Sequence, residues 1–412
     1  MASFGIPLSG LEANSDWLST IGNNLANLNT DGYKNQTLSF GDLLFQMQGT
    51  SGNGDPIQTG SGVQVNGTTS NFTNGNIDTT GVASNMALQG NGFFVVKNGS
   101  ETEYTRAGDF TVNSSGQLTD PSGDLVMGYP AVNGAVSTSS ALGPITVNQS
   151  ATIPAVPTTS FETTTNLQAG SAVGATFSTP ISVVDSLGVS QTLSIQYTNT
   201  GTNTWSYNIT LPASATGGTG NPTSLATGTL TFNSSGALTS PSGSVTGVNI
   251  TGLSDGAAPM NLSWNLTDAS GNPTLTQQDS ASATTATNQN GYGVGTLTGY
   301  SVLANGTVQG QFSNNQTLAL GQVAVAGFAN VQGLSQLSNG DFQSTVASGA
   351  AVVGQAGVGG NGTITGGAVE ASNVDLSTEF ANMIVAQQGY EANAKVLTAF
   401  DQVSQATIQL VS

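Results

Sequence analysis

The sequence contains neither cysteine nor histidine, and these two absences exclude most catalytic and metal-binding chemistry. Without cysteine, the chain has no disulfide bond and no thiolate nucleophile. Without histidine, it lacks the usual Ser-His and Cys-His pairs and the commonest ligand of zinc and copper. Carboxylate chemistry such as glycoside hydrolysis or calcium binding remains open, but the acidic residues are scattered and no EF-hand spacing occurs. We therefore expect a protein that is not an enzyme, with no catalytic residue, no cofactor and no metal site.

Positive charge is also scarce. Lys plus Arg number 4 among 412 residues, against 22 Asp plus Glu, so the net formal charge is −18. Nucleic acids and anionic membrane surfaces are recognised by clustered Lys and Arg, so neither is an expected partner. No run of about eighteen apolar residues occurs, which predicts no membrane insertion. The first residues also lack the basic and apolar stretches of a secretory signal. Because the chain is rich in glycine, serine and threonine, we expect an extracellular protein that is exported without a cleaved signal.

The C-terminal residues 372–412 predict a long helix. From Asp375 onwards this stretch has no proline and only one glycine, Gly389. Asp375 is placed to cap the helix N-terminus, and Glu379 adds negative charge near the positive end of the helix dipole. Apolar residues recur in steps of three and four, which is the pattern of an amphipathic helix. We assign one set of them to an assembly seam: Phe380, Met383, Tyr390, Leu397, Phe400 and Val403.

A second amphipathic helix is predicted within residues 1–28. Five apolar residues repeat there with heptad spacing, and we assign them to the same seam: Leu11, Leu18, Ile21, Leu25 and Leu28. Helices at opposite termini suit one antiparallel pair, but an isolated pair buries too little apolar area to offset the cost of ordering it. We expect the pair to pack against copies of the chain. The alternative is that both helices pack onto one globular core.

Between the helices the apolar period changes to two, which predicts antiparallel β-strands. The expected fold class is mainly β with terminal α-helices, in which discontinuous nested β domains accompany a helical coiled-coil domain. Phe93, Phe94 and Phe328 are expected in the core. The predicted division is a helical assembly domain at 1–28 and 372–412, an extended arm or linker at 29–70 lying along a neighbouring subunit, an inner β domain at 71–146 and 293–371, and an inserted outer β domain at 147–292.

Two local patterns refine this division. Residues 113–123 read NSSGQLTDPSG and residues 233–243 read NSSGALTSPSG, which predicts one strand–turn–strand unit used twice. Turn-forming residues also follow the first helix. They either end the helix only or form a hinge that sets the helix relative to the arm, and the hinge residues we name are Asn27, Asp31, Gly32 and Tyr33.

Several stretches resemble the bacterial flagellar rod and hook proteins. The terminal motifs of that family are similar to IGNNLAN at 21–27 with TDGYK at 30–34, and to SNVDLSTEF at 372–380 with QQGYEANAK at 387–395. LQGNGFF at 88–94 is similar to their first β segment. Three further stretches resemble the hook members of the family in particular: GTVQG at 306–310, LGQVAVAGFAN at 320–330 and QGL at 332–334.

This resemblance implies a structural subunit of the flagellar hook, a curved flexible tube that joins the rod to the filament and transmits torque. Implied partners are copies of the chain, the rod, hook-cap and hook–filament junction proteins, and the type III export apparatus. The alternative within the family is a distal rod protein of the basal body, which is shorter, so the insertion at 147–292 favours the hook. A secreted β-rich adhesin is the alternative from another class, but it needs a signal peptide or an anchor.

Overall fold

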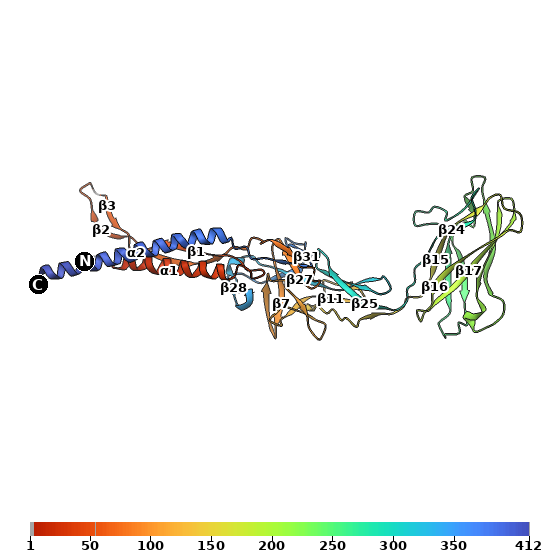
Figure 1. The fold of residues 1–412 in the computed structure, drawn as a ribbon, viewed down its shortest axis with the longest axis horizontal. Helices are drawn as coiled ribbons and strands as arrows, with labels where there is room; N and C mark the ends of the chain where they lie inside the picture. Colours follow the sequence, from red (N-terminus) through yellow and green to blue (C-terminus); the bar gives the residue numbers. More distant parts are fainter. Residues whose placement is uncertain (1–3, 54, 412) are drawn as a thin grey trace. The chain divides into compact units, whose positions relative to one another are not determined.

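The computed structural model describes residues 4–53 and 55–411, which divide into two compact units. Unit 1 takes the described residues of Met1–Gln149, Gly299–Gln311 and Thr317–Ser412, and unit 2 consists of Ser150–Thr298 and Phe312–Gln316. Unit 2 is therefore inserted into unit 1 along the chain. Strands dominate both units, and one α-helix lies towards each end of the chain (Figure 1). The predicted class, mainly β with terminal α-helices, is confirmed.

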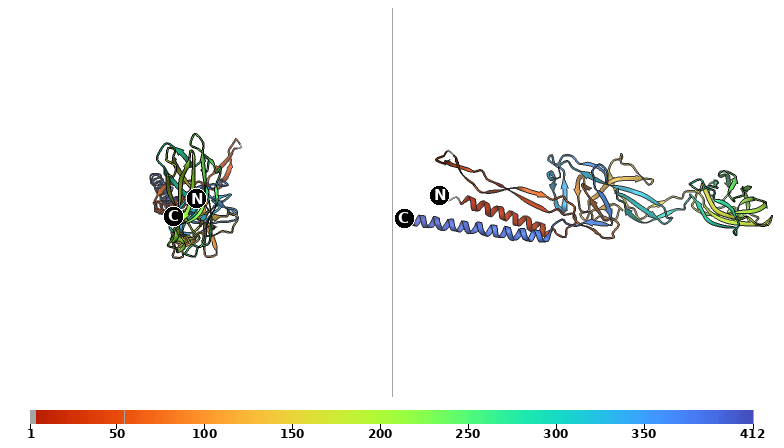
Figure 2. Two further views of the ribbon diagram at one scale, coloured as in Figure 1. Left: turned by 90° about the vertical axis from the view of Figure 1, so that its right-hand side faces the viewer. Right: turned by 90° about the horizontal axis from the view of Figure 1, so that it is seen from above.

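The helices α1 (Gly5–Ala26) and α2 (Leu376–Val411) lie side by side and run antiparallel in unit 1 (Figures 1 and 2). Asp375 caps α2 as predicted, because its Oδ1 accepts the Thr378 N–H at 2.8 Å. Neither described α-helix is long and apolar enough to cross a membrane. The predicted first helix was too long at its C-terminal end. The chain turns after Ala26, where Asn27 Nδ2 bonds back to Asn23 O at 2.9 Å, so Leu28 lies outside α1.

The predicted arm consists of antiparallel strands. β1 (Gln36–Asp42) pairs with β4 (Val63–Ser70), and further out β2 (Gln46–Thr50) pairs with β3 (Pro56–Thr59). The register of the inner pair slips at a β-bulge between Ser39 and Phe40. Phe40 packs edge-on against Trp17 of α1, with ring centroids 5.8 Å apart, so the arm lies against the first helix.

The β part of unit 1 is built on one long sheet. Its strands follow the order β25 (Gly295–Val302), β26 (Thr307–Phe312), β27 (Thr317–Gly327), β11 (Leu125–Val132), β7 (Phe93–Asn98), β8 (Glu101–Thr105), β29 (Asp341–Gln343) and β28 (Ser335–Gln336). Short strands attach to it: β9 (Thr111–Val112), β10 (Leu118–Thr119), β12 (Ala135–Val136), β13 (Gly143–Pro144) and β30 (Val352–Gln355). The expected core phenylalanines Phe93 and Phe94 are buried, and Phe328 is partly buried against the same cluster.

Two small sheets pair strands of the first hundred residues with strands that shortly precede α2. β6 (Met86–Gln89) pairs with β31 (Thr363–Gly366), and β5 (Ile77–Thr79) pairs with β32 (Ala368–Glu370). Two short 3₁₀ turns, Val331–Gly333 and Ser338–Gly340, flank β28. The last residue of β32, Glu370, therefore lies shortly before the start of α2.

The repeated sequence makes the same turn in both places. Asn113 Oδ1 accepts the Gln117 N–H at 2.9 Å, and Asn233 Oδ1 accepts the Ala237 N–H at 2.9 Å. In each case the turn joins two antiparallel strands, β9 to β10 and, in unit 2, β19 (Thr223–Phe232) to β20 (Leu238–Ser240). The predicted strand–turn–strand unit is confirmed, and its asparagine supplies the turn hydrogen bonds.

Unit 2 packs two sheets around one apolar core. The first has the order β16 (Thr176–Val184), β17 (Ser190–Gly201), β18 (Thr204–Leu211), β19 (Thr223–Phe232) and β20 (Leu238–Ser240), with a 3₁₀ turn at Ala213–Thr216. The second has the order β21 (Val245–Ile250), β22 (Met260–Asn265), β15 (Ser160–Gln168) and β23 (Leu275–Gln278), and β24 (Ala283–Gln289) pairs with β15. A further short strand, β14 (Thr152–Ile153), belongs to neither sheet and pairs with the first residues of β25.

The second sheet corrects the expectation of antiparallel strands throughout. β15 pairs antiparallel with β24 but parallel with β22 and β23. Alternation of polar and apolar residues shows that one face of a strand is buried, and it carries no information on the direction of the neighbouring strand. β15 is far from β22 and β23 in the sequence, so no hairpin imposes antiparallel pairing on them.

We predict that Trp264→Ala strongly destabilises unit 2. Trp264 is fully buried, its Nε1 lies 3.3 Å from Thr163 Oγ1, and its ring contacts those of Tyr207 and Phe161. Loss of a buried tryptophan costs about 3–5 kcal/mol of the free energy of unfolding. Urea denaturation followed by circular dichroism measures it. The matched control is Leu187→Ala at an exposed position, expected within about 0.5 kcal/mol of the parent chain. A loss below about 1 kcal/mol for Trp264→Ala contradicts the prediction.

Candidate functional site: the terminal helix pair and its joint

The two helices meet through glycine and asparagine where they lie closest. A Cβ added at Gly10 of α1 would come within 2.7 Å of Asn393 Oδ1, and one added at Gly389 of α2 within 2.6 Å of Asn14 Oδ1. Each asparagine side chain bonds back to the glycine carbonyl four residues earlier in its own helix. Asn14 Nδ2 donates to Gly10 O at 2.6 Å, and Asn393 Nδ2 donates to Gly389 O at 2.9 Å. Each helix thus offers a Gly-x-x-x-Asn pair whose glycine receives the asparagine of the other helix. Only glycine leaves room for this approach.

Each helix also buries an alanine. Ala13 of α1 and Ala386 of α2 are buried, at 4% and 0% exposure. At the start of α1, Phe4 packs edge-on against Phe400 of α2, with ring centroids 6.1 Å apart. The heptad pattern of leucines gave no sign of the Gly–Asn contacts. Their sequence signal is the spacing of four residues between glycine and asparagine in both helices.

The residues assigned to the assembly seam differ in burial. Ile21 is buried within the chain, at 1% exposure. Half-buried positions are Leu11, Leu18, Leu25, Leu28, Met383, Leu397 and Phe400. Exposed positions are Phe380 at 50%, Tyr390 at 43% and Val403 at 59%. The pair therefore covers part of the predicted seam and leaves three of its large apolar side chains in solvent.

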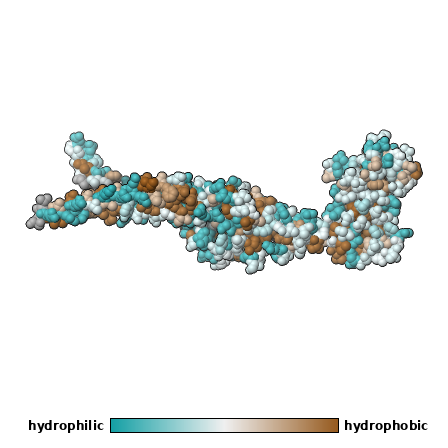
Figure 3. Space-filling view, viewed as in Figure 1, coloured by the Kyte–Doolittle hydropathy of each residue, from teal (hydrophilic) through white to brown (hydrophobic). Residues whose placement is uncertain are grey.

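Further apolar side chains are exposed on the same elements. In the space-filling view, apolar surface runs along the helix pair (Figure 3). On α2 the exposed aliphatic residues outside the predicted seam are Leu376, Ile384, Val385, Val396 and Ile408. The exposed large apolar residues of the arm are Phe40, Leu44, Phe45, Met47 and Ile57, of which Leu44 is 90% exposed. Contiguous exposed apolar area is a common feature of interaction surfaces.

One buried carboxylate fixes the helix pair to the β part of unit 1. Glu370 is fully buried at the end of β32, and its Oε1 lies 2.6 Å from Lys34 Nζ. Its Oε2 lies 3.3 Å from a terminal guanidinium nitrogen of Arg106, which follows β8. Oε1 also accepts hydrogen bonds from Asn74 Nδ2 at 3.2 Å and the Gly75 N–H at 2.8 Å. Burial lowers the pKa of both Lys34 and Arg106, and the Glu370 charge opposes that shift.

The residues proposed as a hinge lie around this ion pair. Gly32 donates its N–H to Glu370 O at 2.6 Å, and its φ of +70° favours glycine. A Cβ at Gly32 would lie 2.4 Å from Ala107 N, so no other residue fits there without backbone movement. Asp31 is half-buried, and burial and then the Asp109 charge raise the pKa of its carboxyl.

Tyr33 and Asn24 connect α1 to the arm. Tyr33 is buried, and its hydroxyl donates to Asn24 Oδ1 at 3.1 Å and accepts from Asn23 Nδ2 at 3.1 Å. Asn24, at 1% exposure, forms both backbone hydrogen bonds with Gln36, the first residue of β1. Asn27 bonds back to Asn23 in the last turn, and its Oδ1 accepts a hydrogen bond from the Thr30 hydroxyl at 3.1 Å. The structure thus brings Gly32 and Tyr33 together at a bonded joint, while Asn27 lies at the helix end.

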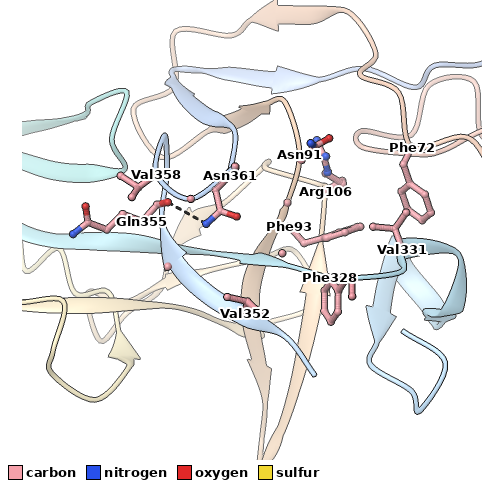
Figure 4. A pocket seen from close by; sticks show the side chains of 16 residues that line it. Phe72, Asn91, Phe93, Arg106, Phe328, Val331, Val352, Gln355, Val358 and Asn361 are labelled. Atoms are coloured by element: carbon pink, nitrogen blue, oxygen red, sulfur yellow. Dashed lines mark hydrogen bonds between the residues drawn. The ribbon is translucent and has the colours of Figure 1, made fainter. Parts of the chain in front are cut away.

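A hollow of about 650 Å³ adjoins Arg106 in unit 1 (Figure 4). Aromatic and aliphatic side chains dominate its lining, among them Phe72, Phe93 and Phe328. The dashed contact in the figure is the bond from Asn361 Nδ2 to Gln355 O at 3.1 Å. The guanidinium of Arg106 is the only charged group of this lining among the described residues.

We predict that Glu370→Gln destabilises unit 1 by about 3–5 kcal/mol, because the amide leaves Lys34 and Arg106 buried without a counter-charge. Urea denaturation at neutral pH measures the loss. Glu391→Gln, the same substitution at an exposed position of α2, is the control and is expected to change stability by about 0.5 kcal/mol or less. Equal stability of the two variants contradicts this account of the joint.

Four family models match parts of the chain, including the segments of both terminal helices. They are, in chain order, the Flagella basal body rod protein at residues 7–34, the Flagellar hook protein FlgE/F/G D1 domain at 87–166, the Flagellar basal body protein FlaE D2 domain at 159–292 and the Flagellar basal body rod FlgEFG protein C-terminal at 365–410. The first and last of these cover α1 with its joint and most of α2.

Curated relatives match over their whole length. The flagellar hook protein FlgE of Escherichia coli (strain K12) is 34% identical over 424 residues, covering 99% of this chain and 100% of the relative. FlgE of Salmonella typhimurium is 35% identical over 428 residues with the same coverage, and FlgE of Treponema pallidum is 30% identical over 471 residues, covering 100% and 99%. The crystal structure of Helicobacter pylori flagellar hook protein FlgE2 shares the fold, with a TM-score of 0.51 at 14% identity over 70% of this chain and 98% of that one. With this identity to hook proteins across the full chain, and with family models of flagellar basal body rod proteins at both helices, the chain belongs to the flagellar hook protein family.

Proposed function

We propose that this chain polymerises with copies of itself into the curved, flexible tube of the flagellar hook, which links the rod to the filament and transmits torque. One observation carries the proposal: the helix pair of a hook-family chain leaves a row of large apolar side chains in solvent. Full burial of such a side chain stabilises by about 1.5–3 kcal/mol. Copies of the same helix pair would supply that cover, so that assembly stabilises the ends of the chain.

The assembly seam that we propose combines both helices. Exposed members on α2, Phe380, Tyr390 and Val403, would contact neighbouring subunits directly. Half-buried members such as Leu18 and Leu397 would contact both the partner helix and a neighbour. In a tube, such helices would form concentric layers around a central channel. The arm would lie along a neighbouring subunit through its exposed apolar tip.

The joint at Asn27, Asp31, Gly32 and Tyr33 would set the helix pair relative to the arm and the β part of unit 1. The close fit of Gly32 against the backbone and the bonded hydroxyl of Tyr33 support this role. Bending of the tube would then fall to contacts between the β parts of neighbouring subunits. The stretch 186–254 carries no formal charge and is rich in Ser, Thr, Asn and Gly. Such surfaces make weak hydrogen bonds and water bridges that exchange readily as subunits slide.

The remaining partners follow from the same proposal. The subunit would meet rod, hook-cap and hook–filament junction proteins at the ends of the tube. It would leave the cell through the type III export apparatus, without a cleaved signal, and would act outside the cell as a structural protein without catalytic activity. A distal rod protein is not favoured, because FlgE hook proteins match the whole chain, including unit 2.

Val403→Asp is expected to abolish polymerisation while leaving the chain folded. Val403 is 59% exposed in the single chain, so the charge is tolerated there, but it would lie unpaired in a seam without water. Negative-stain microscopy and sedimentation measure tube formation, and circular dichroism measures the fold. Gln402→Asp adds the same charge at the preceding exposed polar position and is the control. Tubes from Val403→Asp as abundant as those of the parent chain would remove this residue from the seam.

Leu44→Ser tests the arm. Leu44 is 90% exposed, so its replacement is expected to change the stability of the single chain by about 0.5 kcal/mol or less. If the part of the arm between β1 and β2 packs on a neighbour, the concentration needed for polymerisation rises roughly tenfold, because about 1.4 kcal/mol of buried apolar contact is lost. Sedimentation against chain concentration measures it, with Gln58→Ser on the neighbouring strand β3 as the control. An unchanged critical concentration would show that this part of the arm does not contact a neighbour.

A further inference from the structure

The hollow beside Arg106 is walled by aromatic side chains from three separate parts of unit 1 (Figure 4). Phe72 lies between β4 and β5, Phe93 begins β7, and Phe328 follows β27. The ring of Phe93 meets the other two edge-on, with its centroid 5.6 Å from that of Phe72 and 5.8 Å from that of Phe328. Valine and glycine residues form most of the remaining lining. We call this site the aromatic hollow; its volume of about 650 Å³ is within the range of sites for small organic molecules.

Arg106 brings an unpaired donor to the aromatic hollow. Its side chain is buried, at 2% exposure, and its guanidinium carbon lies 5.4 Å from the centroid of the Phe93 ring. The two terminal nitrogens are bonded, Nη1 to Glu370 Oε2 and Leu88 O and Nη2 to Gly90 O. Nε is buried and has no hydrogen-bond partner among the described residues. A buried donor without an acceptor costs free energy, so an acceptor that reaches it is stabilised there.

The orientation of the guanidinium directs this donor towards the lining. The Nε–H and Nη2 share one edge of the guanidinium plane. Nη2 bonds to Gly90 O at 2.7 Å, and the next two residues, Asn91 and Gly92, line the aromatic hollow together with Arg106. Arg106 lies beside Asn91 in the close view of the hollow (Figure 4). An acceptor in the aromatic hollow is therefore placed to meet the Nε–H.

The charges around Arg106 give a second, independent reason for an anion. Arg106 and Lys34 share the one carboxylate of Glu370, and no further carboxylate in the described part of the chain lies at ion-pair distance from either cation. This buried group carries a net charge of +1, although the chain as a whole carries −18. Burial lowers the pKa of Lys34, and the Arg106 charge lowers it further, against the Glu370 charge. A buried positive charge without full compensation favours the approach of a negative group.

We propose that the aromatic hollow binds a small organic acid, whose carboxylate accepts the Arg106 Nε–H and whose apolar body lies against the phenylalanine rings. A carboxylate suits the guanidinium because charge-assisted hydrogen bonds are stronger than neutral ones. Arg106 is the only charged group of the described lining, so the site balances one negative charge, which favours a monocarboxylate over a phosphate. The rings favour an aromatic body, which they contact edge-on or stacked. This site is separate from the assembly seam, which lies on the helices.

Calorimetric titration of the full, unpolymerised chain with naphthoate tests the proposal. We expect about one molecule per chain and a dissociation constant of about 10⁻⁴–10⁻³ M, as is usual for so small a ligand. The uncharged analogue naphthamide is expected to bind about tenfold more weakly, because it makes no charge-assisted bond. Acetate, which lacks the ring, is expected to bind at least tenfold more weakly. Absence of naphthoate binding, or equal binding of the acid and the amide, overturns the proposal and leaves the Nε–H to water.

Val358 allows a test by charge that leaves the buried residues unchanged. It lines the aromatic hollow and is 58% exposed, so a charged side chain is tolerated there. At low salt, Val358→Asp is expected to weaken naphthoate binding about twofold to fourfold and Val358→Lys to strengthen it by a similar factor. Naphthamide binding is expected to change in neither variant. Val346→Asp and Val346→Lys, at an exposed valine outside the lining, are the controls. Equal naphthoate binding in the two Val358 variants places the ligand elsewhere and overturns the proposal.

Arg106→Lys tests the donor itself. Lysine keeps the positive charge but has no Nε–H, so naphthoate binding is expected to weaken at least fivefold while naphthamide binding changes little. Circular dichroism shows whether this variant is folded; if it is not, the two Val358 variants decide. Naphthoate binding that is unchanged in folded Arg106→Lys overturns the assignment to Arg106.

Discussion

The buried charge of Glu370 is the interaction on which the arrangement of unit 1 depends. Of the four basic residues in the chain, two, Lys34 and Arg106, are buried against this one carboxylate. Buried ion pairs contribute little net stability, but they penalise every arrangement that separates the charges. Here the charges belong to the segment after α1, the end of β8 and the segment before α2, so only one placement of the helices satisfies all three. Apart from Lys34 and Arg106, the chain has only two basic residues, Lys97 and Lys395.

In the helix pair, small residues make the close contact between the helices, and large apolar residues lie on the exposed surface. Glycine, alanine and asparagine make the contact within the chain, where Gly10 and Gly389 let the helices approach closely. Larger apolar residues such as Phe380 and Val403 remain outside. Small residues fill little volume, so most of the large apolar side chains of the stripe stay half-buried or exposed in the single chain. Within the hook protein family, such a division suits a subunit whose final fold is completed by its neighbours.

Local features were readable from the sequence, whereas contacts between distant segments were not. Asp375 as a helix cap and the two asparagine turns depend on residues within a few positions, so their patterns predicted them correctly. The pairing of Lys34 with Glu370 joins residues 336 positions apart, and no periodicity encodes it. The parallel neighbours of β15 and the convergence of Phe72, Phe93 and Phe328 are equally long-range. The seam assignment stays a prediction, because residues of a second subunit decide it.

The contact between the helices also carries an approximate two-fold symmetry. A half-turn about an axis between α1 and α2 exchanges Gly10 with Gly389 and Asn14 with Asn393. Identical helices in a symmetric dimer make isologous contacts of this kind, here formed within one chain. A slip by one helical turn in one direction would set glycine against glycine and leave a gap, and in the other it would set asparagine against asparagine. Both slips lose the Gly–Asn packing, so this contact favours a single axial register of the pair.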